Sequence, residues 1–476
     1  MKYILTYALI LLLTLSSACL HAQTKTATPL TGRARIDSLQ KELVKAKEDT
    51  NKCNILSDLS FAYINVAPDS GITYGRQDSA VAARLDWKKG VAAADNSLGL
   101  NYSNKTDYAT ALAYHEKALR LSGERCDKKG IAAATNFIGT IYRKQSDYPR
   151  ALEYYFNGLK MAEELGDKNV VARNTGNIGL VYQYQSDYPR ALEYFFRSLK
   201  IFEETGDKSG MAINTGNIGI VYSYQSDFPR ALEYYFKSLK IDEELGDRNN
   251  MAMNTGNIGN VYLQLADYPR ALEYHFKALK MCEELGDKSG VAKNTGNIGN
   301  VYYAEHNYTQ AVAWHFNAFR IAAEIGERRD EAIDLASIGD DYTQIAAGTN
   351  SESNVATPAA NTDLPVAPYL PDSLIPHGRA ALLHKAVDYL GKAITIDKEI
   401  HNLTFLQGCY EILSTADSLL GDYKGALSAR SLYELYKDSV FSQENNKKIV
   451  QQQMKDEYGR REDSIKLVSC QSEIVG

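Results

Sequence analysis

The chain repeats itself every 40 residues, almost verbatim, through its central part. The copy that begins at Asn174 reads NTGNIGLVYQYQSDYPRALEYFFRSLK, and the copy that begins at Asn214 reads NTGNIGIVYSYQSDFPRALEYYFKSLK. Two more copies begin at Asn254 and Asn294. A period of 20–50 residues is typical of supersecondary units stacked side by side. The sequence therefore predicts an array of units over most of the chain and argues against a compact catalytic domain there.

Each copy predicts two helices joined by a short turn, because its apolar residues recur at helical spacing in two stretches. Asp187 precedes the second stretch and is a suitable N-cap, since its carboxylate can accept from the free amides of the first turn. Pro189 falls in that first turn, where a missing N–H costs nothing, and Gly206 is placed as a left-handed C-cap. The same capping residues recur in other copies at Asp107, Asp147, Asp227, Asp267, Asn307, Asp422, Gly166, Gly246, Gly286 and Gly326.

These units resemble the tetratricopeptide repeat family in a form with 40 residues per unit. The small residues Gly179 and Ala191 stand where the two helices of such a unit pack closest. The resemblance is strong over residues 91–330 and weaker over 51–90 and 402–441, and it implies an all-α, right-handed solenoid of about nine units. The predicted starts are Asn51, Val91, Ile131, Val171, Met211, Met251, Val291, Glu331 and Asn402.

Other parts of the chain flank or interrupt the predicted array, which spans 51–345 and resumes at 379–441. Residues 346–378 contain five of the chain's 11 prolines and are predicted to be a disordered insertion. Residues 23–50 are expected to form a lead-in helix, and residues 442–476 a polar helical tail through which two chains could associate. Residues 1–22 carry one Lys before a short apolar run and predict a signal peptide. We therefore expect export to the periplasm or cell envelope, with lipidation at Cys19 as a second interpretation.

Composition and motifs exclude several classes of function. The net charge is -6 and Lys and Arg form no block, which argues against nucleic acid as a partner. No later segment is apolar enough to span a membrane, and no catalytic motif, metal site or cofactor site is predicted. His115, His275 and His315 share one column of the repeat with aromatic residues, so we interpret them as packing residues. The periodic Glu pairs, such as Glu203–Glu204, are interpreted as a solvated face.

The functional candidate is a column of asparagines in the first helix of each unit. In the family that the chain resembles, this part of the first helix lines a concave groove, and asparagines there hold the backbone of an extended peptide. An alternative is that these asparagines bond neighbouring helices and hold the superhelix together. The predicted groove residues are Asn177, Asn217, Asn257, Asn297, Asn260, Asn300, Arg173, Gln183, Tyr184, Tyr224, Gln264 and Lys293.

Two functions from different classes follow from the sequence. The first is an exported, non-catalytic scaffold that binds a protein or peptide. The second arises because the opening of the chain, the segments Pro68–Gly75 and Leu85–Gly90, and the helical tail resemble periplasmic sensor regions of Bacteroidetes-type signalling proteins. Such proteins continue through a membrane helix into a histidine kinase or an adenylate or guanylate cyclase. This resemblance implies the sensor half of a truncated or split signalling protein.

Overall fold

The computed structural model describes residues 32–64, 66–348 and 375–442, and these residues form helices and short turns with no strand. The helix α2 (Gly32–Lys45) leads into a series of helix pairs. The first helices of the pairs are α3 (Thr50–Ala62), α5 (Lys88–Asn104), α7 (Lys128–Lys144), α9 (Lys168–Tyr184), α11 (Lys208–Tyr224), α13 (Arg248–Gln264), α15 (Lys288–Ala304), α17 (Arg328–Gly348) and α19 (Leu403–Leu420). The second helices are α4 (Pro68–Arg84), α6 (Tyr108–Glu124), α8 (Tyr148–Leu165), α10 (Tyr188–Thr205), α12 (Phe228–Leu245), α14 (Tyr268–Leu285), α16 (Tyr308–Ile325), α18 (Arg379–Glu399) and residues 423–442.

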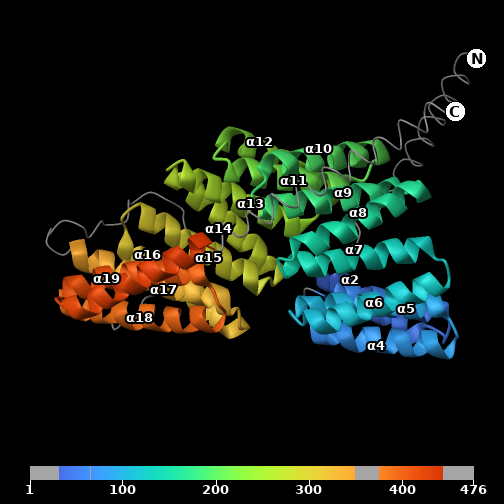
Figure 1. The fold of residues 1–476 in the computed structure, drawn as a ribbon, viewed down its shortest axis with the longest axis horizontal. Helices are drawn as coiled ribbons and strands as arrows, with labels where there is room; N and C mark the ends of the chain where they lie inside the picture. Colours follow the sequence, from blue (N-terminus) through green and yellow to red (C-terminus); the bar gives the residue numbers. More distant parts are fainter. Residues whose placement is uncertain (1–31, 65, 349–374, 443–476) are drawn as a thin grey trace, which may run out of the picture.

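The pairs stack in chain order into an α-solenoid, as the repeat predicts. Figure 1 shows them following one another along an arched path from α4 at one end to α19 at the other. Each first helix packs directly on the first helix of the next unit, whereas successive second helices make at most sparse contacts. The array therefore curves with its first helices on the inner side. The predicted signal peptide, most of the predicted insertion and all but the first residue of the predicted tail lie outside the described residues.

Capping residues determine where the helices of the central units begin and end. Asp187 accepts from the Arg190 backbone amide, and equivalent caps occur at Asp147, Asp227, Asp267 and Asn307. Gly206 ends α10 with φ of 73°, a left-handed conformation that favours glycine. Both predicted capping columns are thus confirmed. The sequence reading missed a further column that begins the first helices, in which Asp207 follows Gly206 directly and caps Gly210.

The two glycines of the NTGNIG motif allow two different helices to pack closely against the first helix. An alanine Cβ at Gly219 would lie 2.8 Å from the ring of Tyr235 on the paired helix. A Cβ at Gly176 would lie 3.0 Å from the amide oxygen of Asn214 on the next first helix. The second glycine of the motif therefore allows close packing within a unit, and the first allows close packing between units.

Ion pairs join the two helices of a unit at the periodic Glu residues. The second Glu of each pair, near the end of a second helix, accepts from a cation at the start of the first helix of the same unit, as in Lys168–Glu204 at 3.1 Å and Lys208–Glu244 at 2.7 Å. The remaining pairs of this kind are Lys128–Glu164, Arg248–Glu284 and Lys288–Glu324. All are largely exposed, so each contributes at most about 1 kcal/mol. The Glu pairs thus face solvent, as predicted, and also connect the two helices of a unit.

Buried asparagines occupy the junctions between units. Asn174, Asn214, Asn254 and Asn294 open the four motifs and are buried. Asn214 and Asn294 donate to backbone carbonyls four residues earlier, each at 2.9 Å. Asn254 instead donates to Ser238 at 2.9 Å and to Asp242 at 2.8 Å on the preceding second helix. Asn254 therefore joins its helix to a neighbouring one, and Asn174 does the same by accepting from Asn136 at 3.0 Å.

The junction carboxylate Asp242 makes the stability of the array depend on pH. Burial raises the pKa of Asp242 from 3.8 to about 6, against the hydrogen bonds of Asn254 and Ser238, and the nearby Asp247 raises it further. Between these two values the folded state holds a proton that the unfolded state has lost, so stability falls as pH rises through this window. We expect Asp242→Ala, which introduces the residue found at Ala162 and Ala322, to remove that dependence. Thermal unfolding at pH 4 and pH 6.5 tests this, and a wild-type-minus-variant difference in Tm that does not change with pH would contradict it.

Candidate peptide-binding groove

One face of each first helix remains open to solvent on the inner side of the array. In α9 it consists of Arg173, Asn177, Leu180 and Tyr184, whose spacing of four, three and four residues places them on one helical face. We call the equivalent residues of four units the inner stripe. Its other members are Ile213, Asn217, Ile220 and Tyr224 of α11, Met253, Asn257, Asn260 and Gln264 of α13, and Lys293, Asn297, Asn300 and Ala304 of α15.

The asparagine column of the inner stripe is distinct from the buried asparagines at the junctions. Asn177, Asn217, Asn257 and Asn297 are each partly exposed, although each lies only three residues after a fully buried asparagine. Among the described residues, none of these four side chains makes a hydrogen bond within the protein. Helix-joining bonds are made from the buried column, as by Asn254, whereas the column in the stripe keeps an amide donor and acceptor available to a ligand.

A groove of about 340 Å³ lies on the inner side where α7, α9 and α11 meet. It brings together three of the predicted residues, Arg173, Asn177 and Asn217. Its walls are both apolar and polar, because Leu180, Ile213, Asn136 and Asp207 also line it. The other asparagines of the column and Lys293 do not line this groove. They lie further along the inner stripe, on α13 and α15.

The last asparagine of the stripe, Asn300, has a partner within the protein. Its amide oxygen lies 3.2 Å from Nε2 of the buried His315, whose Nδ1 lies 2.7 Å from the Asp341 carboxylate. Both ring nitrogens face oxygen atoms that can accept, and this arrangement favours the doubly protonated imidazolium form of His315. Burial alone would lower the pKa of His315, but the Asp341 carboxylate raises it, and the net direction is upward. Asn300 is therefore a stripe residue that also contacts the buried pair His315–Asp341. Asn260, in contrast, is exposed and has no such contact among the described residues.

The predicted aromatic residues lie at the edge of the stripe, where each first helix ends. Tyr184 stacks on Tyr148 with ring centres 6.5 Å apart, and Tyr224 stacks on Tyr188 at 6.0 Å. Tyr184 and Tyr224 nevertheless remain 48% and 63% exposed. They can therefore offer a ring surface to the part of a ligand that extends beyond the groove.

Two further predicted residues, Gln183 and Gln264, differ from each other. The amide oxygen of Gln183 is buried, and among the described residues it has no hydrogen-bond partner. Gln264 is exposed at the end of α13. Gln264 alone of the two therefore presents its amide to solvent.

Five apolar residues of the stripe were not predicted, namely Leu180, Ile213, Ile220, Met253 and Ala304, and two of them are largely exposed. Ile213 and Met253 are large apolar side chains, 51% and 53% exposed, at the positions equivalent to Arg173 and Lys293. The 40-residue register could have identified them, since the two basic residues of the same column were recognised. Exposed apolar side chains were not sought because hydrophobic residues in a repeat are usually assigned to its core.

The histidine column packs inside the array. His115 and His275 are buried against Gly99 and Gly259, where an added Cβ would lie 2.6 and 2.8 Å from their rings. Burial lowers the pKa of each to about 4, so both are neutral at physiological pH. Over the part of the chain that the structure describes, no group of His, Cys, Asp and Glu residues is arranged to hold a metal ion. A helix sufficiently long and apolar to cross a bilayer is also absent from that part.

This fold and stripe define a class of protein, the helical-repeat solenoid with an open inner face. A sequence profile described as tetratricopeptide repeat matches residues 90–164, 130–204, 170–244, 210–284 and 247–324. The chain belongs to the tetratricopeptide repeat family. Among curated proteins, no sequence is significantly similar to it.

Solved structures share the fold at low sequence identity. A signal transduction ATPase with numerous domains (STAND) from Pyrococcus horikoshii, which has a tetratricopeptide repeat sensor, is 16% identical with a TM-score of 0.54. The match covers 83% of this chain and 55% of that one. A Rap protein complexed with Competence and Sporulation Factor is 13% identical with a TM-score of 0.50, over 83% of this chain and 100% of that one.

Proposed function

We propose that this protein is a non-catalytic scaffold that holds an extended segment of a protein or peptide against its inner stripe. The observation that carries the proposal is the asparagine column. It supplies one partly exposed amide per unit in four successive units, and none of the four is used by a hydrogen bond within the described protein. The Rap protein, which shares the fold, was solved in complex with a factor, and this supports a binding role.

The chemistry of an amide suits the backbone of an extended chain. One Asn side chain offers both a donor and an acceptor and can pair with the N–H and C=O of a peptide unit. Each such bond contributes only about 1 kcal/mol net. Several of them at fixed intervals hold the ligand in one register, which isolated contacts would not do. The net charge of -6 and the interspersed charges make a protein partner more suitable than a nucleic acid.

We also propose that the protein acts outside the cytoplasm, in the periplasm or cell envelope. The support is the signal-like sequence of residues 1–22, in which Cys19 offers a site for lipidation. A second candidate function is the sensor half of a signalling protein. One observation favours it, since the STAND protein that shares the fold carries its repeats as a sensor. An immunoblot of fractionated cells distinguishes the two, because a sensor fused to an output domain would give a much larger band in the membrane fraction.

Replacing Asn217, Asn257 and Asn297 together by Ala tests the proposed function. Peptides are first selected from a displayed library of random 16-residue segments, with the full chain as bait. We expect the triple variant to bind the selected peptides about 100-fold more weakly, since three bonds of about 1 kcal/mol are lost. Fluorescence anisotropy measures the affinity, and circular dichroism should show unchanged helicity and melting.

The buried asparagines provide the matched comparison. Asn214→Ala with Asn294→Ala removes the same side chain from two of the same three helices, α11 and α15, and is expected to lower the melting temperature instead. If the stripe variant binds as tightly as the wild type, the proposed function is wrong. If the stripe variant melts early, the column is structural.

A further inference from the structure

The position just before each NTGNIG motif varies, whereas the six residues of the motif are constant. The four motifs at 174–179, 214–219, 254–259 and 294–299 are identical, yet the residues that precede them are Arg173, Ile213, Met253 and Lys293. We call these four residues the reading column. The copies agree at all six positions of the motif and differ at the position before it. The packing of one unit on the next therefore does not dictate the residue at the reading column.

All four side chains of the reading column are available to a ligand. Each is exposed, and among the described residues Arg173 and Lys293 form no ion pair or hydrogen bond. Ile213 and Met253 leave half of their surface in water, which favours polar residues when a position only faces solvent. Exposed apolar side chains next to unused polar groups are typical of a binding surface.

The reading column lies beside the asparagines that would hold the ligand backbone. Each of its residues precedes a stripe asparagine by four positions, which is one helical turn on the same face. In the groove this proximity is direct, since Arg173, Ile213, Asn177 and Asn217 line the same cavity. A backbone held by the amides therefore brings its side chains within reach of the reading column.

We propose that the reading column selects an extended segment with two acidic side chains that flank two apolar side chains. This inference rests on the proposed function and adds the chemistry of the ligand. The acidic groups pair with Arg173 and Lys293, and the apolar groups cover Ile213 and Met253. Adjacent packed helices lie about 8–10 Å apart, and an extended chain advances about 3.3 Å per residue. One unit therefore corresponds to about three ligand residues, and the two acidic side chains are about nine residues apart.

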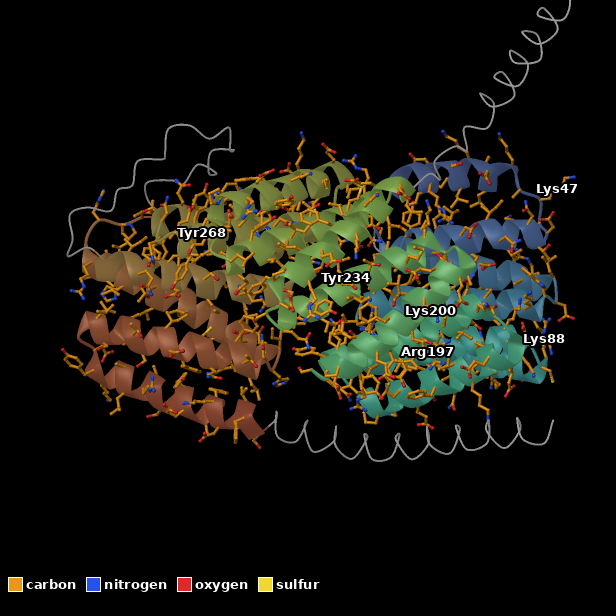
Figure 2. The ribbon with its side chains drawn as sticks, turned by 90° about the horizontal axis from the view of Figure 1, so that it is seen from above. Lys47, Lys88, Arg197, Lys200, Tyr234 and Tyr268 are labelled. Atoms are coloured by element: carbon orange, nitrogen blue, oxygen red, sulfur yellow. The ribbon has the colours of Figure 1, made fainter. Side chains whose placement is uncertain are left out.

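A charge reversal tests the proposal with the full chain. The same random 16-residue library is selected on the wild type and on the double variant Arg173→Glu, Lys293→Glu. Lys200→Glu with Lys240→Glu is the matched control, because it makes the same change in net charge on the exposed outer helices α10 and α12; Lys200 is labelled in Figure 2. Selected sequences are then synthesised with acetylated and amidated ends, so that all of their charges come from side chains.

Wild type and control should both enrich acidic residues at two positions about nine apart with apolar residues between them. The double variant should enrich basic residues at those positions and bind the wild-type peptides at least about tenfold more weakly. Selected peptides that depend on the stripe asparagines and yet lack this pattern would contradict the proposed role of the reading column and leave the scaffold function intact. So would selected peptides that bind the charge-reversed variant equally well. If none of the proteins enriches any peptide, the proposed function itself fails, and the inference fails with it.

Discussion

Replacing Gly219 by alanine is expected to destabilise the array by about 1–3 kcal/mol, the usual cost of forcing an extra group into a packed core. The new Cβ would lie 2.8 Å from the ring of Tyr235, and the ring cannot move aside because Tyr235 is only 3% exposed. The two helices of that unit, α11 and α12, would have to separate. In a solenoid each unit is stabilised chiefly by its neighbours, so the loss should concentrate at this unit. Hydrogen exchange of the α11 and α12 amides, together with thermal unfolding, measures it.

Gly123→Ala is the matched control for this substitution. Gly123 also lies in a helix, α6, but an added Cβ there meets no atom within 4 Å. An alanine at that position should be neutral or stabilise the protein by up to about 1 kcal/mol, since glycine is the poorer helix former. Equal effects of the two substitutions would show that helix propensity, and not the contact with Tyr235, decides the outcome.

His315→Phe is expected to cost about 3–5 kcal/mol at neutral pH, because it leaves Asp341 as a buried carboxylate without its cation. Asp341 is fully buried on α17, and the nearby Asp340 cannot compensate it, since it is also acidic. The phenyl ring itself fits this position, which Phe195 occupies in another unit. The predicted loss therefore comes from charge and not from packing.

The chain contains its own template for a rescue. The positions of His315 and Asp341 correspond, two and three units earlier, to the pairs Tyr235–Val261 and Phe195–Val221. We therefore expect the double variant His315→Phe, Asp341→Val to recover the stability that the single variant loses, measured by thermal unfolding and by hydrogen exchange in α16 and α17. A double variant as unstable as His315→Phe would contradict the assignment of a buried ion pair.

Much of the fold is predictable because each capping and packing signal recurs in several copies of the repeat. A single Asp before a helix or Gly after one is a weak signal, but Asp187 and Gly206 recur at fixed positions in several copies. The register also shows that His275 shares its column with Tyr235, and this identifies it as a packing residue. Repetition thus replaces the information that one copy lacks.

The repeat does not show which of two asparagines faces solvent. Asn214 and Asn217 are separated by three residues, so both fall on nearly the same side of a helix, and only the position of the next unit decides which is covered. The pair His315–Asp341 was missed for a related reason. Asp341 stands in a column of valines, and its partner lies 26 residues earlier on another helix. Exceptions to the repeat depend on contacts between units, which a single copy does not encode.

The first glycine of each NTGNIG motif also influences the spacing of the ligand. At Gly176 and its equivalents the backbone of one first helix meets an asparagine of the next, and this contact limits how closely the helices approach. Because each unit carries one asparagine of the column Asn177, Asn217, Asn257 and Asn297, the same contact sets the interval between successive amides of that column. A bulkier residue at Gly216 or Gly256 would lengthen that interval without touching the stripe, and a ligand whose backbone matches it would lose register. The spacing of the ligand on the inner face is therefore fixed by the packing of one first helix on the next, and not by the stripe side chains alone.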